Sequence, residues 1–236
     1  MRIGILLCDD VKPELQEKHQ NYPDMFAGIL LNADPSLTLR FYRVMDFEYP
    51  VDLAENDGYI ISGSRYSVYD DHPWIKQFEA FVRELYDNKI PTVGICFGHQ
   101  MMAQALGGEV TRSENGWGVG IATSDFTQSA NWMGNTKGQF SLVVSHQDQV
   151  SRLPEGSQTF ASSDFCPIGM FTVDNHFLAI QGHPEFSRAY SFDLMESRRD
   201  RIPERVINAG QDSLKQTTDS DDVTRWMLDF LAQAKQ

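Results

Sequence analysis

The sequence predicts an α/β fold in which helices cover both faces of a doubly wound, mainly parallel sheet. Short apolar segments alternate with helical segments over residues 2–106, an order typical of parallel sheets whose strands are buried on both faces. From 109 to 180 the pattern changes to short β segments with Gly and Asn turns, which predicts a small antiparallel β extension. A length of 236 residues with 41% hydrophobic content fits a single domain, 1–236.

The first half of the chain contains the expected parallel strands. Residues 2–8 are apolar and predict a buried first strand, and the mostly helical residues 9–31 follow. Two further strands are expected at 37–44, where apolar and polar residues alternate, and at 57–61. A stripe of aromatic and aliphatic residues at helical spacing predicts a core-packing helix over 73–88.

The second half contains the expected extension and a helical C-terminal segment. The catalytic core is expected to span about 2–187, and residues 187–236 are expected to be helical. A polar interruption at 216–222 precedes a final amphipathic helix at 223–234. The β segments of the extension are expected at 119–123, 140–145, 158–161, 168–173 and 177–180.

A glycine-flanked cysteine occupies the junction between an expected strand at 92–95 and an expected helix at 99–106. Gly94-Ile95-Cys96-Phe97-Gly98 has the form of a nucleophile elbow, Gly-x-nucleophile-x-Gly, in which glycines permit a very tight turn. At the N-terminus of a helix the unpaired N–H groups favour an anion, and the thiolate is the reactive form of cysteine. The alternative is a packing cysteine that ends a buried strand. The paired glycines favour the nucleophile.

A histidine and a glutamate follow the last expected strand, in Gln181-Gly182-His183-Pro184-Glu185. A thiol nucleophile needs a base that also protonates the leaving amine, and that base needs a carboxylate to orient it. His183 and Glu185 fit these two roles. The alternative is a surface loop with a solvated carboxylate.

The other histidines have weaker contexts. His99 is expected to support the start of the helix, and His146, which follows a strand, is a candidate for lining a pocket. His19, His72 and His176 have no context that indicates more than a surface position.

Three segments, GICFGHQ, SHQD and QGHPE, in this order and spacing, resemble the class I glutamine amidotransferase family over most of residues 2–187. In that family a Cys-His-Glu triad hydrolyses the side-chain amide of glutamine through a γ-glutamyl thioester and releases ammonia. The resemblance implies that Cys96 is the nucleophile, His183 the base and Glu185 the residue that orients it.

The resemblance also implies the substrate contacts. The oxyanion hole is expected from the backbone N–H groups of Phe97 and Gly63, and Gln100 matches the family residue that binds substrate glutamine. The segment Ser145, His146, Gln147 matches the one that holds the α-amino and α-carboxylate groups. No metal and no cofactor is implied.

One departure from the family pattern lies in the oxyanion loop. Where many members have Gly-Gly-Pro, this chain has Gly63-Ser64-Arg65, which keeps a backbone donor and adds a hydroxyl and a cation near the pocket. This form resembles stand-alone members, including γ-glutamyl peptidases. Aromatic residues such as Tyr66, Tyr69 and Trp117 are expected either to contact a larger leaving group or to pack around the loop.

Three functions follow as hypotheses. No Gly-x-x-x-x-Gly-Lys-Ser/Thr segment occurs in the sequence, and residues 187–236 are too few for an ATP site. The first hypothesis is therefore a free-standing hydrolase of glutamine or a γ-glutamyl compound. The second is the glutaminase subunit of a two-chain amidotransferase, related to GMP synthase, that supplies ammonia to a separate synthetase chain. The third is a non-catalytic regulatory protein on the same fold.

Composition limits the partners. A net charge of −13 disfavours nucleic acid and anionic membranes as partners. The expected small-molecule substrate is implied by the family resemblance. No apolar run approaches the roughly 20 residues that span a bilayer, and the N-terminal strand lacks the features of a signal peptide, so a cytoplasmic protein is expected. Cys8, Cys96 and Cys166 are widely spaced, which indicates neither disulfides nor a zinc site.

Overall fold

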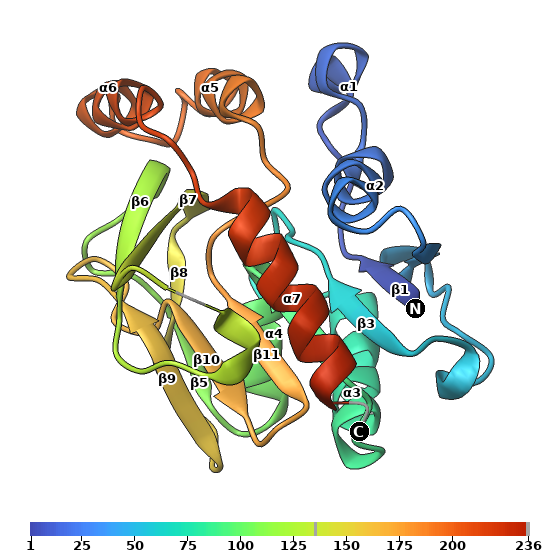
Figure 1. The fold of residues 1–236 in the computed structure, drawn as a ribbon. Coiled ribbons are helices and arrows are strands. Elements are labelled where there is room, and N and C mark those ends of the chain that lie inside the picture. The colour runs from blue at the N-terminus through green and yellow to red at the C-terminus, as the bar shows by residue number, and fades with distance from the viewer. Residues whose placement is uncertain (135, 235–236) are drawn as a thin grey trace.

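A computed structural model describes residues 1–134 and 136–234 and shows a nine-stranded sheet (Figure 1). Its strand order is β2-β1-β3-β4-β11-β10-β9-β6-β7. The first five strands pair in parallel, and the last four continue the sheet in antiparallel pairs. The predicted fold class is therefore confirmed. The bounds of these strands, in sheet order, are Thr38–Arg43, Arg2–Leu7, Gly58–Ile61, Thr92–Ile95, Phe177–Ile180, Met170–Val173, Ser157–Ser162, Gly118–Phe126 and Gln139–His146.

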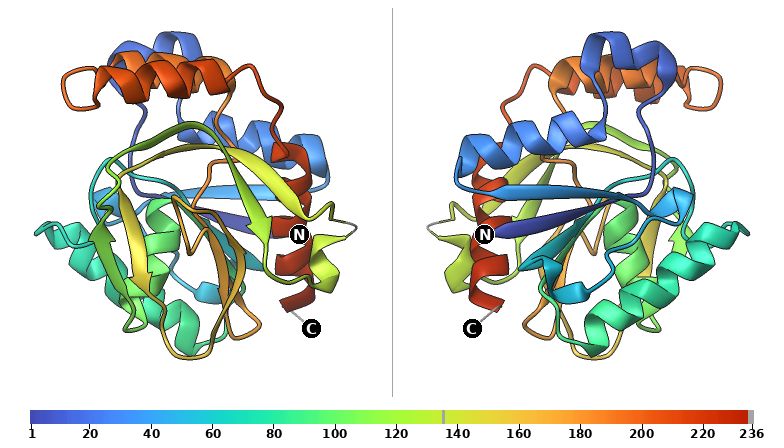
Figure 2. Two further views of the ribbon diagram at one scale, coloured as in Figure 1. Left: turned by 90° about the vertical axis from the view of Figure 1, so that its left-hand side faces the viewer. Right: turned by 90° about the vertical axis from the view of Figure 1, so that its right-hand side faces the viewer.

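Helices cover the two faces of the sheet (Figures 1 and 2). Alternate residues of β1 point to opposite faces, so Ile3 and Ile5 pack in one apolar cluster while Leu6 and Cys8 pack in the other. Helices α2 and α7 contribute to the first cluster, and α3 and α4 contribute to the second. The remaining helices, α1, α5 and α6, lie together at one end of the sheet (Figure 2). The bounds of α1 to α7 are Pro13–His19, Tyr22–Ala33, Pro73–Asp87, Phe97–Ala105, Arg188–Glu196, Glu204–Ser213 and Ser220–Ala234.

Two helices begin earlier than the sequence pattern predicted. Helix α4 starts at Phe97, because the chain completes its turn within the single residue Cys96. Helix α7 starts at Ser220, because acidic residues in a first turn interact favourably with the helix dipole and need no apolar pattern. Helix α4 ends in a glycine cap: Gly107 has φ +87°, and the Gly108 N–H donates to the Ala103 carbonyl at 2.8 Å, as in a Schellman motif.

Two strands, β5 (Glu109–Arg112) and β8 (Asp148–Arg152), were not predicted. They form a separate antiparallel pair. Their apolar content is low, and Val110 is the buried residue of β5, so they lack the alternation that marks a strand. Within residues 1–134 and 136–234, every helix is too short or too polar to span a lipid bilayer.

Candidate active site

Cys96 lies in a strained turn between β4 and α4. Its backbone has φ +52° and ψ −96°, a conformation that side-chain-bearing residues rarely adopt. The flanking glycines make the turn possible: a Cβ on Gly94 would lie 2.6 Å from the Gly98 carbonyl group, and a Cβ on Gly98 would lie 2.7 Å from the Ile61 Cβ. Cys96 is the N-cap residue of α4, the end of the helix at which backbone N–H groups lack partners within the helix.

The other two cysteines are in different surroundings. Burial raises the pKa of the Cys8 thiol well above its ordinary value, and burial likewise raises the pKa of Cys166 to about 12. Both side chains therefore remain neutral thiols at physiological pH. Both cysteines are buried and fit a packing role.

His183 and Glu185 lie beside Cys96 because β11 pairs in parallel with β4, so that Ile180 faces Ile95 and both strands end at the same edge. The His183 Nδ1 atom is 2.7 Å from Glu185 Oε1, and the two side chains are 3% and 0% exposed. The imidazole stacks on the Phe186 ring at 3.9 Å. Two contacts thus fix the orientation of this ring.

Burial and the neighbouring charges shift the pKa of His183 in opposite directions. Burial alone would lower the pKa of the imidazole, but the negative charges of Glu185 and Cys96 outweigh that effect and raise the pKa above its ordinary value. The raised pKa favours the imidazolium form of this ring. The cluster of Cys96, His183 and Glu185 is called the floor of the site below.

The expected oxyanion donors flank the floor. Phe97 is the first residue of α4, so its N–H has no partner within the helix. Gly63 follows β3 and packs so closely on the floor that a Cβ there would lie 2.8 Å from the His183 Cε1 atom and 3.7 Å from the Cys96 Cβ. A glycine is thus required for the loop to approach the sulfur.

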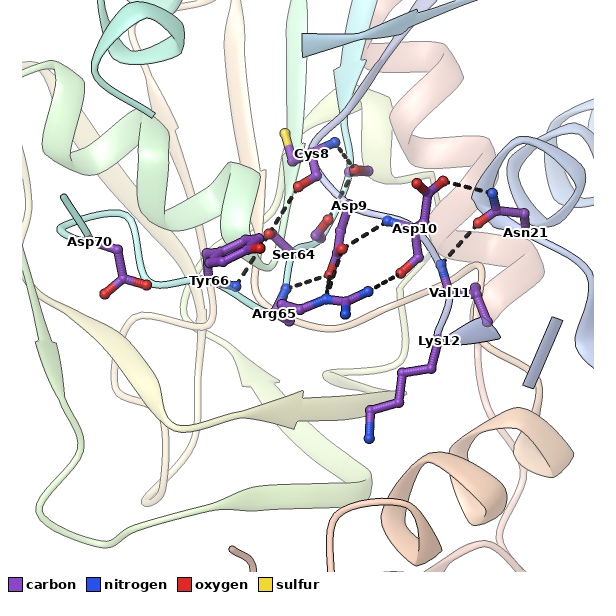
Figure 3. A network of polar contacts seen from close by, with 12 residues as sticks. Cys8, Asp9, Asp10, Val11, Lys12, Asn21, Ser64, Arg65, Tyr66 and Asp70 are labelled. Atoms are coloured by element: carbon purple, nitrogen blue, oxygen red, sulfur yellow. Dashed lines mark hydrogen bonds and ion pairs between the residues drawn. The ribbon is translucent and has the colours of Figure 1, made fainter. Parts of the chain in front are cut away.

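Ser64 and Arg65, the departure from the family pattern, are held by other groups of the protein (Figure 3). The Ser64 hydroxyl donates to the Cys8 carbonyl at 3.0 Å. The Arg65 Nε atom donates to the Asp9 carboxylate at 2.8 Å, and its Nη2 donates to the Asp10 carbonyl at 2.6 Å. The sequence suggested a hydroxyl and a cation available at the pocket. Both residues do line the pocket, but the hydroxyl is bonded to the Cys8 carbonyl and the cation is paired with Asp9.

A pocket of about 360 Å³ opens above Cys96, and the four expected substrate residues line it. The Gln100 amide donates to the Asp148 carbonyl at 2.9 Å, and the His146 Nδ1 atom lies 3.0 Å from the same oxygen. Ser145 and Gln147 complete the set. Burial lowers the pKa of His146 to about 4, so this ring is a neutral part of the wall.

His99 is buried away from this pocket, and its Nε2 atom lies 3.0 Å from the Ile168 carbonyl oxygen. This supports the structural role expected for it. The surface positions expected of His19 and His176 are wrong. The His19 Nε2 atom lies 2.6 Å from the Asp193 carboxylate between α1 and α5, and His176 is 4% exposed with its ring near the Tyr86 carbonyl.

Besides Tyr66 and Arg112, the pocket is lined by a cluster in which two guanidinium groups lie over an indole: Trp117, Arg198 and Arg201. They are called the rim below. Trp117 was considered from the sequence, but the two arginines were not. The signal that could have indicated them is the run Ser197-Arg198-Arg199-Asp200-Arg201, an unusual concentration of arginine in a chain with a net charge of −13.

The fold and this constellation at the carboxyl edge of the parallel strands define an α/β enzyme whose ligand pocket lies where such sheets bind ligands. A model of the family "Glutamine amidotransferase class-I" matches residues 32–191, and the chain belongs to that family. The predicted family and the prediction of an enzyme are confirmed.

Individual relatives agree with this assignment. The chain is 31% identical over 188 residues to gamma-glutamyl peptidase 4 of Arabidopsis thaliana, a match that covers 77% of this chain and 74% of the relative. It is 37% identical over 142 residues to the glutamine-hydrolysing GMP synthase of Lactobacillus acidophilus, covering 59% of this chain and 26% of that protein. A glutamine amidotransferase structure from Thermotoga maritima superimposes with a TM-score of 0.74 at 18% identity, over 100% of this chain and 97% of the other.

Proposed function

We propose that this enzyme hydrolyses the amide bond of a γ-glutamyl group, in glutamine or in a γ-glutamyl compound, with Cys96 as nucleophile. The observation that carries the proposal is the floor itself: a cysteine at a strained elbow, next to an imidazole that a buried carboxylate holds at 2.7 Å. A nucleophile, a base and a group that orients the base are the three parts that acyl transfer needs.

In the first step the Cys96 thiolate attacks the carbonyl carbon of the γ-amide. Negative charge moves to the carbonyl oxygen, where the N–H groups of Phe97 and Gly63 stabilise it by about 3–4 kcal/mol. The His183 imidazolium then gives its proton to the leaving nitrogen. The C–N bond breaks, ammonia or an amine leaves, and a γ-glutamyl thioester remains on Cys96.

In the second step water attacks the thioester carbonyl. The neutral His183 imidazole accepts a proton from that water, and the C–S bond breaks to restore the thiolate and release glutamate. Glu185 keeps the Nδ1 side of the ring occupied, so the Nε2 side is the one that faces the reaction. No metal or cofactor takes part in either step.

The free-standing hydrolase is the better supported of two substrate assignments. Gamma-glutamyl peptidase 4 matches this chain across most of both proteins, and we propose a γ-glutamyl amide of a small amine or peptide as the substrate. Gln100, Ser145, His146 and Gln147 would hold the glutamyl part, because they line the pocket above Cys96.

The second candidate is a glutaminase subunit that supplies ammonia to a separate synthetase chain. The observation in its favour is the match to GMP synthase, which covers a quarter of that longer protein. This candidate predicts weak glutamine hydrolysis by the chain alone and stronger hydrolysis when the synthetase and its nucleotide are present.

The test is mass spectrometry of the purified chain after incubation with glutamine and with a panel of γ-glutamyl dipeptides. Cleavage of a dipeptide in preference to glutamine supports the free-standing hydrolase, and slow cleavage of glutamine alone supports the glutaminase subunit. Cys96→Ala is expected to be inactive, whereas Cys166→Ala, a matched control at a neutral thiol, is expected to stay active. No cleavage of any substrate, with or without a synthetase, would contradict both candidates.

A further inference from the structure

The turn after α5 carries two arginines to the mouth of the pocket. Its backbone is ordered, since the N–H groups of Arg201 and Ile202 both donate to the Arg198 carbonyl, at 3.1 and 3.0 Å. Ile202 is 2% exposed and packs in a small apolar cluster with Met195. Ile202 therefore fixes the turn to the protein interior, while Arg198 and Arg201 line the pocket.

These two arginines have no acidic partner. Among the described residues, neither guanidinium lies within 4.0 Å of a carboxylate, although Arg199, between them, pairs with Glu196 at 2.7 Å and Arg65, across the pocket, pairs with Asp9 at 2.8 Å. The Arg198 Nη1 atom donates to the Ser145 hydroxyl at 2.7 Å. Its Nε atom is buried without a hydrogen-bond partner among the described residues, which is costly for a cationic group.

Positive charge is concentrated where Arg198 and Arg201 lie next to each other. Both guanidinium groups lie over the Trp117 ring, with Cζ atoms 5.7 and 5.9 Å from its centre, so the indole holds two like charges close together. Lys12 lies nearby, since its Nζ donates to the Ser197 carbonyl at 2.9 Å, but this cation is itself 3.9 Å from the Glu14 carboxylate. Burial and the charge of Arg201 lower the pKa of Arg198. An anion between the arginines would relieve this repulsion.

The acidic group on the pocket wall does not supply that anion. Asp148 lines the same pocket, but its carboxylate accepts hydrogen bonds from Ser67 and from the Tyr69 hydroxyl, the latter at 2.9 Å. It is therefore engaged with the loop that follows β3. Asp148 is the only acidic residue among the described residues that line the pocket, so an anion for the two arginines is expected from a ligand.

We propose that Arg198 and Arg201, supported on Trp117, bind a carboxylate of the substrate. A guanidinium offers a planar pair of N–H donors that matches a carboxylate, and the pairing is strong where water is partly excluded. The proposal rests on the proposed function, because the site opens directly onto Cys96. Both arginines lie outside residues 32–191, the part that the family model matches.

Two carboxylates of the substrate could occupy the site, and they are distinguishable. One is the α-carboxylate of the glutamyl part, which Ser145, the residue bonded to Arg198, is expected to contact. The other is a carboxylate on the leaving amine, such as the C-terminus of a γ-glutamyl dipeptide. Glutamine has only the first, γ-glutamylalanine has both, and γ-glutamylalanine amide has only the first but is as large as the acid.

The experiment measures binding and turnover of these three compounds with Arg198→Gln, Arg201→Gln and the matched control Arg199→Gln. Binding is measured by isothermal titration in the Cys96→Ala background, so it is independent of turnover. Because a charged hydrogen-bonded pair is lost, affinity and kcat/KM are expected to fall about 10- to 100-fold in the two pocket variants and to stay unchanged in Arg199→Gln. Arg201 is exposed, so its variant tests the proposal without endangering the fold.

Each outcome decides between the possibilities. Equal losses for all three compounds assign the site to the α-carboxylate, and a loss confined to γ-glutamylalanine assigns it to the leaving group. Binding of every compound as tight in Arg198→Gln and Arg201→Gln as in the control overturns the proposal, as does the absence of binding to the Cys96→Ala protein. Arginine-dependent binding in an enzyme that cleaves none of the compounds would uphold the carboxylate site and contradict the proposed hydrolysis.

Discussion

The floor and the rim of one pocket differ in how their charged groups are paired. On the floor, Glu185 and His183 are buried but paired with each other. On the rim, Arg198 and Arg201 are in contact with an indole and, among the described residues, with no carboxylate. The charges of the floor are thus paired in the free enzyme, although the Glu185 Oε2 atom is buried without a hydrogen-bond partner among the described residues. The rim arginines, in contrast, gain a carboxylate only when a ligand supplies one.

This difference separates chemistry from selection. Groups that act on every substrate must be fixed in advance, because reorganising charge during the reaction raises the barrier. Groups that discriminate between substrates benefit from an interaction that is unmet in the free enzyme. A ligand that supplies the missing charge then binds more favourably than one that does not. We therefore expect changes on the floor to act on kcat for all substrates, and changes on the rim to act on the preference among them.

The largest expected effect is on the floor. Cys96→Ala and His183→Ala are each expected to reduce kcat about 10⁵-fold or more, because a nucleophile and its base act as a unit. The double variant should then be no slower than either single one. Rapid-quench mass spectrometry should detect the γ-glutamyl thioester in the wild type alone. If the kcat losses of the two single variants multiplied in the double variant, Cys96 and His183 would not form one catalytic unit, and the contrast between floor and rim would fail.

Glu185→Gln is expected to reduce kcat less, about 10²- to 10³-fold, because a thiol is intrinsically nucleophilic and the Phe186 ring still orients the imidazole. Glutamine and dipeptides should lose equally. Glu196→Gln, which removes a surface carboxylate from the Arg199 pair, is the control and should match the wild type. A Glu185→Gln loss as large as that of Cys96→Ala would show that the carboxylate does more than orient the ring.

The same carboxylate is expected to make stability depend on pH. Since the pKa of His183 is raised in the folded state, the stabilisation is complete below about pH 6.5, the ordinary histidine value. Above that pH the unfolded chain loses the proton while the folded one keeps it, so the free energy of unfolding falls by at most about 1.4 kcal/mol per pH unit. Urea denaturation at pH 6, 7.5 and 9 should show a shallower fall for Glu185→Gln. An equal fall of stability with pH in the wild type and in Glu185→Gln would mean that Glu185 does not raise the pKa of His183.

The sequence allowed the floor to be predicted but not the two arginines of the rim, and the reason is physical. Cys96 follows β4 and His183 follows β11, and neighbouring parallel strands must bring such residues to one edge. Local glycine requirements mark the elbow within five residues. Arg198 and Arg201 reach the pocket through the packing of α5 and Ile202 against strands far away in the chain. No periodicity or spacing encodes that contact.

The same limit explains the oxyanion loop. The sequence placed a cation, Arg65, beside the substrate, since nothing in Ser64-Arg65 reveals a partner. The partner is Asp9, at the end of β1, which reaches the loop because β1 and β3 are neighbours in the sheet. Pairing of side chains between non-consecutive segments is the information that a single sequence lacks.

The smallest expected effect concerns the strain stored on the floor. Cys96 has φ +52°, and a side chain in such a conformation costs on the order of 1 kcal/mol or more. Glycine adopts it freely, so Cys96→Gly is expected to be about 1 kcal/mol more stable than Cys96→Ala, although neither is active. Urea denaturation of the two variants checks this, and Arg198→Gly against Arg198→Ala, outside the strained turn, should show no such gain. An alanine variant as stable as the glycine one would mean that the elbow holds its nucleophile without strain.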